Sequence, residues 1–269
     1  MPHIPDGYLD LNIAATFFIL SILVLGYSMI RIRKEKLTTL FGVVAGAIFV
    51  AQMLNWPIPG GTSAHFVGGA LAAILLGPYA GALAMAIVLT IQAIVFNDGG
   101  ITAWGANVWN MAIVNVFLGY YIYRALKRFG VSIASFFAGW IGITVAAIFA
   151  GVEIGLSTSA VSYIATRRPE ALEKKEIGKV PIVIVGILLI LTPVFAYLSE
   201  EVGYSEPLDK AAEILGLEEN KIYEGIFPDY TIPGLDPYLG TLISGIIGLV
   251  IVLLLAIGLK YAYSSRKNP

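Results

Sequence analysis

Residues 79–96 read YAGALAMAIVLTIQAIVF, an apolar run without a single charged side chain. About 20 such residues in an α-helix are enough to cross the hydrocarbon core of a bilayer. Further apolar runs recur along the chain, of which the third is short and Gly-rich: 13–30, 39–55, 65–77, 107–123, 132–152, 179–198 and 238–260. We therefore predict an all-α polytopic membrane protein, with a bundle of about six transmembrane helices followed by a C-terminal two-helix hairpin.

The overall composition agrees with this class and excludes several others. The chain is 58% hydrophobic and 13% charged, with a mean hydropathy of +0.82, whereas soluble domains are about a quarter charged. A net charge of -1 without a basic patch gives no support to nucleic-acid binding. There is no cysteine, so thiolate metal sites are excluded. Because the sequence also lacks a recognisable catalytic motif, we expect a protein that is not an enzyme.

Basic residues predict the orientation, because loops that carry Lys and Arg stay on the cytoplasmic side. The segment before the first run has neither residue, whereas two later connections have several: Arg31, Arg33, Lys34 and Lys36, then Arg124, Lys127 and Arg128. We therefore expect a multi-pass protein of the cell membrane with an external N terminus. The loop 55–64 and the segment 97–100 then lie outside as well.

The number of predicted membrane crossings between Arg128 and Arg167 does not fit their location, because the basic residues place both on the cytoplasmic side. Two crossings should separate them, but the run 132–152 uses most of the intervening chain. Polar residues and glycine at 153–159 predict a turn, after which too few residues remain for a return helix. We expect a missing or re-entrant crossing near 156–162.

The sequence divides into three parts: a membrane domain (1–168), a charged cytoplasmic linker (169–178) and a C-terminal module (179–269). In this module two transmembrane helices flank an external acidic segment, 199–237. Apolar residues recur at helical spacing over 208–215, which predicts a short amphipathic helix there.

The only two histidines, His3 and His65, both lie outside in this topology. A histidine in second position can hold a divalent metal with three nitrogens: the terminal amine, its own amide and its imidazole Nδ1. Planar nitrogen sets suit Ni(II) or Cu(II), and His65 would add a fourth nitrogen. Pro2 has no amide proton to lose, so this chelate requires removal of Met1, which makes the Pro2 nitrogen the terminal amine. The alternative is a solvated His3 and a His65 that only caps or packs.

Four polar side chains are candidates for supporting the metal ligands: Ser63, Asn97, Asp98 and Asn107. Polar groups at membrane depth mark either function or hydrogen bonding between helices. For Asn110 we expect the second role.

Three segments, HIPDGYL at 3–9, PIPGGTSAH at 57–65 and DGGITAWGANVWNM at 98–111, resemble the CbiM/NikM family. Members of this family are the substrate-capturing membrane components of energy-coupling factor importers for cobalt or nickel. The C-terminal module resembles a PDGLE-type accessory domain, here fused, through residues 207–213 and 228–230. The usual Asp-Gly pair is not present in it.

The resemblance implies that Ni2+ or Co2+ is the transported substrate and is held by Pro2, after loss of Met1, by His3 and by His65. It also implies an energy-coupling transmembrane subunit and cytoplasmic ATPase subunits as partners. Two features depart from the family: the inserted Pro2, and the lack of a helix before residues 162–169. The alternative is therefore a transport-deficient membrane assembly or metal-sensing protein that keeps the fold.

Overall fold

The computed structural model describes residues 3–32, 39–58, 62–157, 208, 209, 212, 219 and 221–265. It is a helical membrane protein, as predicted. Among these described residues, four helices are long and apolar enough to cross a membrane: Leu11–Arg31, Pro78–Phe96, Val131–Ser157 and Pro237–Ala262. A shorter apolar helix covers Leu40–Gln52. The predicted run 179–198 and the linker 169–178 lie outside the described residues.

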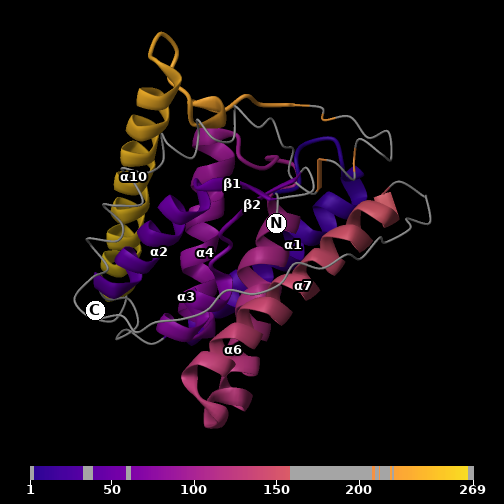
Figure 1. Cartoon of the computed structure of the whole chain (residues 1–269), viewed down its shortest axis with the longest axis vertical. Helices are drawn as coiled ribbons and strands as arrows, with labels where there is room; N and C mark the ends of the chain where they lie inside the picture. Colours follow the sequence, from indigo (N-terminus) through magenta and orange to yellow (C-terminus); the bar gives the residue numbers. More distant parts are fainter. Residues whose placement is uncertain are drawn as a thin grey trace.

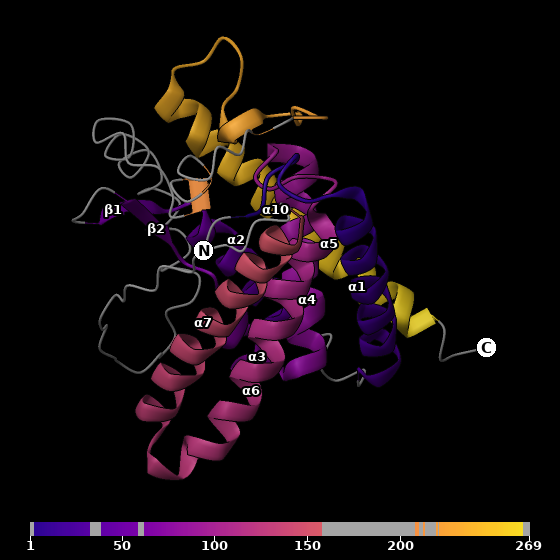
Figure 2. The same cartoon turned by 90° about the vertical axis from the view of Figure 1, so that its right-hand side faces the viewer.

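The helices follow the apolar runs closely and are labelled in Figure 1 and Figure 2: α1 (Leu11–Arg31), α2 (Thr39–Gln52), α3 (Gly69–Leu76), α4 (Pro78–Ile91), α5 (Trp104–Asn107), α6 (Asn115–Leu126), α7 (Val131–Ser157) and α10 (Pro237–Ser265). In the part of the chain that the structure describes, two segments are π-helical: η2 (Gln92–Phe96) extends α4, and η3 (Val108–Val114) joins α5 to α6. The short 3-10 helix η4 (Lys127–Phe129) precedes α7, and η5 (Pro228–Tyr230) precedes α10. Pro78 at the first position of α4 has the backbone angle that a helix start requires.

Helix α4 is the centre of the bundle. In the apolar stretch within Pro78–Phe96, 78% of the residues are buried. In the corresponding stretch of α1 only 17% are buried, so α1 lies at the periphery. Alanines and Met85 on α4 are almost fully buried, and helices α1, α2, α3 and α10 contact it. Small side chains let neighbouring backbones approach closely, which is the usual basis of helix packing in membranes.

Helices α6 and α7 form an antiparallel hairpin that extends away from the rest of the bundle (Figure 2). The connection passes through η4 and Gly130, whose φ of 114° is accessible to glycine. One stripe of α7 is buried and consists of small residues at four-residue spacing: Ala134, Ala138, Gly142, Ala146 and Ala150. The opposite side of α7 carries exposed apolar residues, as expected of a helix that faces lipid.

The turn predicted at 153–159 is wrong as far as the structure describes this segment, because α7 continues through Ser157. Glu153 is fully buried, and Asn110 donates a hydrogen bond from Nδ2 to its Oε2 over 2.8 Å. A polar residue that the sequence suggested would end the helix is therefore bonded inside the bundle. This contact also gives Asn110 the interhelical hydrogen bond expected of it, while the crossing expected near 156–162 falls largely outside the described residues.

The segment predicted as an external loop, 55–64, contains two short strands instead. Strand β1 (Asn55–Ile58) pairs antiparallel with β2 (Thr62–His65), with Asn55 opposite His65. The hairpin places His65 at the end of a paired strand, so its position is determined by the register.

Candidate metal centre

The N-terminal segment is buried in the protein. His3 is 7% exposed and Ile4 is fully buried. The Ile4 amide donates to Asn107 Oδ1 over 2.7 Å, and Asn107 Nδ2 donates back to the Ile4 carbonyl over 3.0 Å. The Gly100 amide donates to the same carbonyl over 2.9 Å. Asn107, predicted to support the ligands, thus holds the backbone of the residue that follows His3.

A second fixed point lies at Asp6, which sequence reasoning did not select. Both the amide and the hydroxyl of Thr102 donate to Asp6 Oδ1, over 2.8 and 2.5 Å. Asp6 is 2% exposed, and the backbone of Gly100 lies against it. Gly99 has a φ of +97°, and a Cβ added to it would lie 2.8 Å from Cβ of His3. The glycine pair at 99–100 therefore allows the two segments to come into contact.

His65 is 8% exposed at the end of β2, and its Nδ1 lies 3.0 Å from the carbonyl oxygen of Phe66. Gln52 at the end of α2 donates to the Val67 carbonyl over 2.6 Å and so holds the chain that leaves the strand. Burial, together with positive charge at the nearby His3, lowers the pKa of His65 to about 3. The imidazole is therefore neutral at pH 7, the form in which histidine binds metals.

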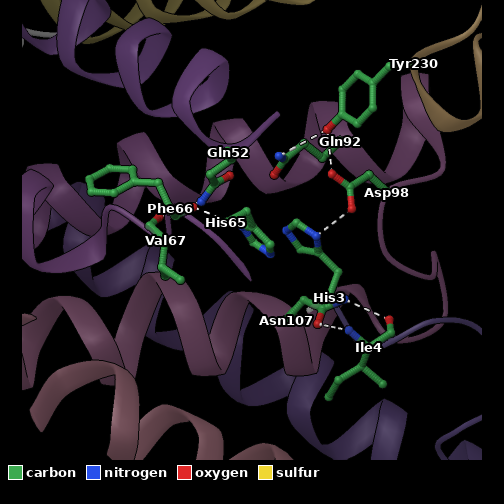
Figure 3. A network of polar contacts seen from close by, with 10 residues as sticks. All are labelled: His3, Ile4, Gln52, His65, Phe66, Val67, Gln92, Asp98, Asn107 and Tyr230. Carbon is green, nitrogen blue, oxygen red and sulfur yellow. Dashed lines mark hydrogen bonds and ion pairs between the residues drawn. The ribbon is translucent and has the colours of Figure 1, made fainter. Parts of the chain in front are cut away.

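The structure brings His3 and His65 together, although the sequence separates them by two helices. Their rings stack with centroids 5.7 Å apart and planes inclined by 15° (Figure 3). On the other side of His3, Nδ1 lies 2.6 Å from Oδ1 of Asp98. Burial raises the pKa of the Asp98 carboxyl, but the charge and hydrogen bond of His3 and the Tyr230 hydroxyl outweigh it and lower the pKa to about 2. Asp98 therefore carries a negative charge beside the two imidazoles at pH 7.

The remaining predicted residues have different positions. Ser63 is buried on β2, two residues before His65, and therefore points to the same side of the strand. Asn97 is 9% exposed and has a left-handed φ of 55°, which ends the π-helical segment η2. Pro2 lies outside the described residues. Ser63 and Asn97 are thus close in sequence to His65 and Asp98, whereas Asp98 and Asn107 contact the N-terminal segment directly.

The nature of the donor atoms limits what this centre can hold. Within the described parts of the chain, no cluster of three or more His, Cys, Asp or Glu side chains is suited to a metal ion. A metal ion at His3 and His65 would therefore need nitrogens of the chain itself in addition to the imidazoles. Such a set of nitrogens is suited to Ni(II) and Cu(II) more than to Mg(II) or Ca(II).

Like Asp6, Tyr230 contributes to the centre without being a candidate from the sequence. Tyr230 donates from its hydroxyl to Oδ2 of Asp98 over 2.5 Å, and Gln92 Nε2 donates to that hydroxyl over 3.3 Å. Tyr230 belongs to the segment 228–230, which the sequence singles out only as part of the C-terminal module. No local pattern relates it to Asp98, since the contact depends entirely on tertiary structure.

Comparison with known proteins agrees with this architecture. Residues 3–198 match the CbiM family, described as cobalt uptake substrate-specific transmembrane region, and residues 182–265 match the PDGLE domain. The putative fused nickel transport protein NikMN of Archaeoglobus fulgidus is 64% identical over 97% of this chain and 99% of its own length. The fused nickel transport protein NikMN of Rhodobacter capsulatus is 42% identical over 57% of this chain and 47% of its own length.

A solved structure described as a truncated transition metal transporter covers 80% of this chain and 100% of its own, with a TM-score of 0.53 and 28% identity. The alignment with the Archaeoglobus relative spans 291 positions, more than the 269 residues of this chain. That relative therefore carries residues that this chain lacks. Since the first family covers most of the chain and the second covers its C-terminal part, this protein belongs to the CbiM family of transporter components, which are not enzymes, and ends in a PDGLE domain.

Proposed function

We propose that this chain is the substrate-specific, metal-capturing membrane subunit of an ATP-driven importer of Ni2+ or Co2+. The observation that carries this proposal is the buried stack of His3 on His65, which are the only imidazoles of the chain. Relatives named as nickel transport and cobalt transport proteins support Ni2+ or Co2+ as the ion. Because both rings are buried, an ion bound to them would lose water molecules of its hydration shell, which supports a capture site.

The proposed ligands are Pro2, His3 and His65. After removal of Met1, the Pro2 nitrogen, the His3 amide and His3 Nδ1 would form two fused chelate rings, and His65 would complete the planar set. In the structure His3 Nδ1 contacts Asp98, so the ion has to displace this carboxylate from the nitrogen. Intact-mass measurement of the purified protein tests the first requirement: we expect a chain without Met1, and a retained Met1 contradicts this ligand set.

The sequence supports separate roles for this chain and for its partner subunits. It has no phosphate-binding loop of an ATPase, so the energy would come from partners: an energy-coupling transmembrane subunit and cytoplasmic ATPase subunits. The N terminus and the metal centre would face the outside of the cell membrane, with the basic connection at 127–128 inside. Residues 1–168 would form the metal-binding domain, 169–178 a cytoplasmic linker and 179–269 the accessory domain.

A second function is favoured by one observation. The Archaeoglobus relative carries residues that this chain lacks, and the sequence has too little chain for a full return crossing before Arg167. A protein that binds the metal without transporting it, as a sensor or assembly factor, would keep the centre and lose a helix.

Uptake of nickel and cobalt by cells that express this chain with its partner subunits tests the proposal. Wild type should accumulate metal, and His3→Ala and His65→Ala should each reduce uptake to the background of cells without the chain. Uptake that is unchanged in both variants contradicts the metal centre. Metal binding by wild type without uptake supports the second function instead.

A further inference from the structure

The segment 225–230 of the PDGLE domain is docked on the metal centre. The amides of Ile226 and Phe227 both donate to the carbonyl of Val95, over 2.8 and 2.7 Å. Val95 lies in the π-helical segment η2, and a helix end leaves such carbonyls without partners in the helix itself. Gly225, with a φ of +81°, brings its backbone against Asn97: a Cβ here would lie 2.9 Å from the Asn97 amide nitrogen.

Tyr230 is held in one orientation by its backbone and its ring. Asp229 and Tyr230 have φ values of 50° and 58°, a left-handed conformation that is unfavourable for residues other than glycine. Two such residues in succession persist only where the surroundings impose them. The Tyr230 ring stacks on Phe96, with centroids 4.6 Å apart and planes inclined by 19°. Its hydroxyl consequently points to the loop that carries Asp98 (Figure 3).

The hydroxyl lies in a directional chain of hydrogen bonds. Gln92 Nε2 can only donate, so the Tyr230 oxygen accepts from it and gives its own proton to Asp98 Oδ2. The other carboxylate oxygen, Oδ1, contacts Nδ1 of His3. Asp98 therefore lies between a residue of the PDGLE domain and a proposed metal ligand.

We propose that Tyr230 is a positioning residue of the metal centre, which holds the Asp98 carboxylate beside His3 before and after the ion binds. This inference rests on the proposed function. When the ion takes His3 Nδ1, Asp98 loses one hydrogen bond and Tyr230 still provides the other. A carboxylate fixed by a charge-assisted hydrogen bond keeps a negative charge next to the cation without the cost of an unpartnered buried group. The PDGLE domain thus contributes directly to metal affinity.

Tyr230→Phe is the decisive variant, because it removes the hydroxyl and keeps the ring that stacks on Phe96. Nickel binding to the purified full chain in detergent, measured by isothermal titration calorimetry, should weaken about tenfold, as for other residues that orient metal ligands. Tyr261→Phe is the matched control, since Tyr261 is 72% exposed on α10, and its affinity should equal that of wild type. The melting temperature of metal-free Tyr230→Phe should stay close to wild type, which separates positioning from general stability.

A double-mutant cycle with Asp98→Asn tests whether Tyr230 acts through Asp98. Asp98→Asn should itself weaken nickel binding, and Asp98→Asn with Tyr230→Phe should be no more than about twofold weaker than Asp98→Asn alone. Unchanged affinity in Tyr230→Phe, or a full additional loss on the Asp98→Asn background, overturns the inference. Failure of the proposed function has a different signature: wild type without nickel binding, or full binding by His3→Ala and His65→Ala.

Discussion

At the scale of single residues, the centre depends on a close contact between Gly99 and His3 that leaves no room for a side chain at position 99. Gly99 permits the backbone of the 97–100 segment to lie against His3, and its φ of +97° is one that side-chain-bearing residues rarely adopt. Gly99 therefore helps to position the imidazole of His3, although it provides no ligand atom for the ion. Substitution at this glycine should impair metal binding without touching any proposed ligand.

Gly99→Ala should lower nickel affinity by about tenfold or more, because strain and displacement of His3 together cost about 1–3 kcal/mol. Gly234→Ala is the control: Gly234 has a similar φ of +85° with no atom within 4 Å of the added Cβ. It carries the same backbone cost without a contact to His3, so its affinity should match wild type. Equal losses in the two variants would mean that backbone strain, and not the contact with His3, decides the effect.

The sequence identified much of this centre but not its connections. His3, His65, Asp98 and Asn107 could be selected because they are rare or polar residues beside apolar runs, and charge topology placed them on one side. Tyr230 could not be selected, because its contact with Asp98 depends on the left-handed turn at 229–230 and on stacking with Phe96. Neither feature has a signal in the local sequence.

At the scale of elements, hydrophobic periodicity and length located the helices well, since α1, α4 and α10 lie within a few residues of their apolar runs. Two predictions of local structure are wrong, each for a physical reason. Glu153 suggested the end of a helix, yet Asn110 provides a hydrogen-bond partner inside the bundle. The sequence predicts a loop at 55–64, which is rich in Pro and Gly, yet the two sides of this segment pair as β1 and β2.

Packing of α10 on α2 provides an element-scale prediction. A Cβ at Gly248 would collide with the ring of Phe49, which is fully buried and itself contacts Phe96. Gly248→Ala should therefore destabilise the protein by about 1–3 kcal/mol through overpacking, measured as a lower melting temperature in detergent. Gly258→Ala, on the same helix with no atom within 4 Å, should keep or raise the melting temperature. A melting temperature of Gly248→Ala at or above wild type would contradict the close packing of these helices.

At the scale of the whole molecule, the α6–α7 connection lies at the opposite end of the molecule from the start of α10 (Figure 2). The segment that leads into α10 contacts the metal centre, because Tyr230 donates a hydrogen bond to Asp98. This arrangement is consistent with an N terminus and a PDGLE segment on one side of the membrane, as the basic residues predict. Orientation is therefore the property to test at this scale.

The chain has no cysteine, so single introduced thiols report orientation directly. Leu235→Cys, at a site 45% exposed before α10, should react with a membrane-impermeant thiol reagent added to intact cells. Phe129→Cys, at a site 55% exposed between α6 and α7, should react only after the cells are opened. The reverse pattern would place the metal centre inside and contradict import from the exterior.

In the proposed centre, His3 and His65 together hold the transported ion. Calorimetric titration of the purified full chain with nickel tests it most directly, with Thr144→Ala as a control in which an exposed side chain away from the centre is removed. We expect one ion per wild-type or Thr144→Ala chain, and an affinity at least about 100-fold weaker in His3→Ala and in His65→Ala, equivalent to about 2.7 kcal/mol. Wild-type affinity in both histidine variants would contradict it.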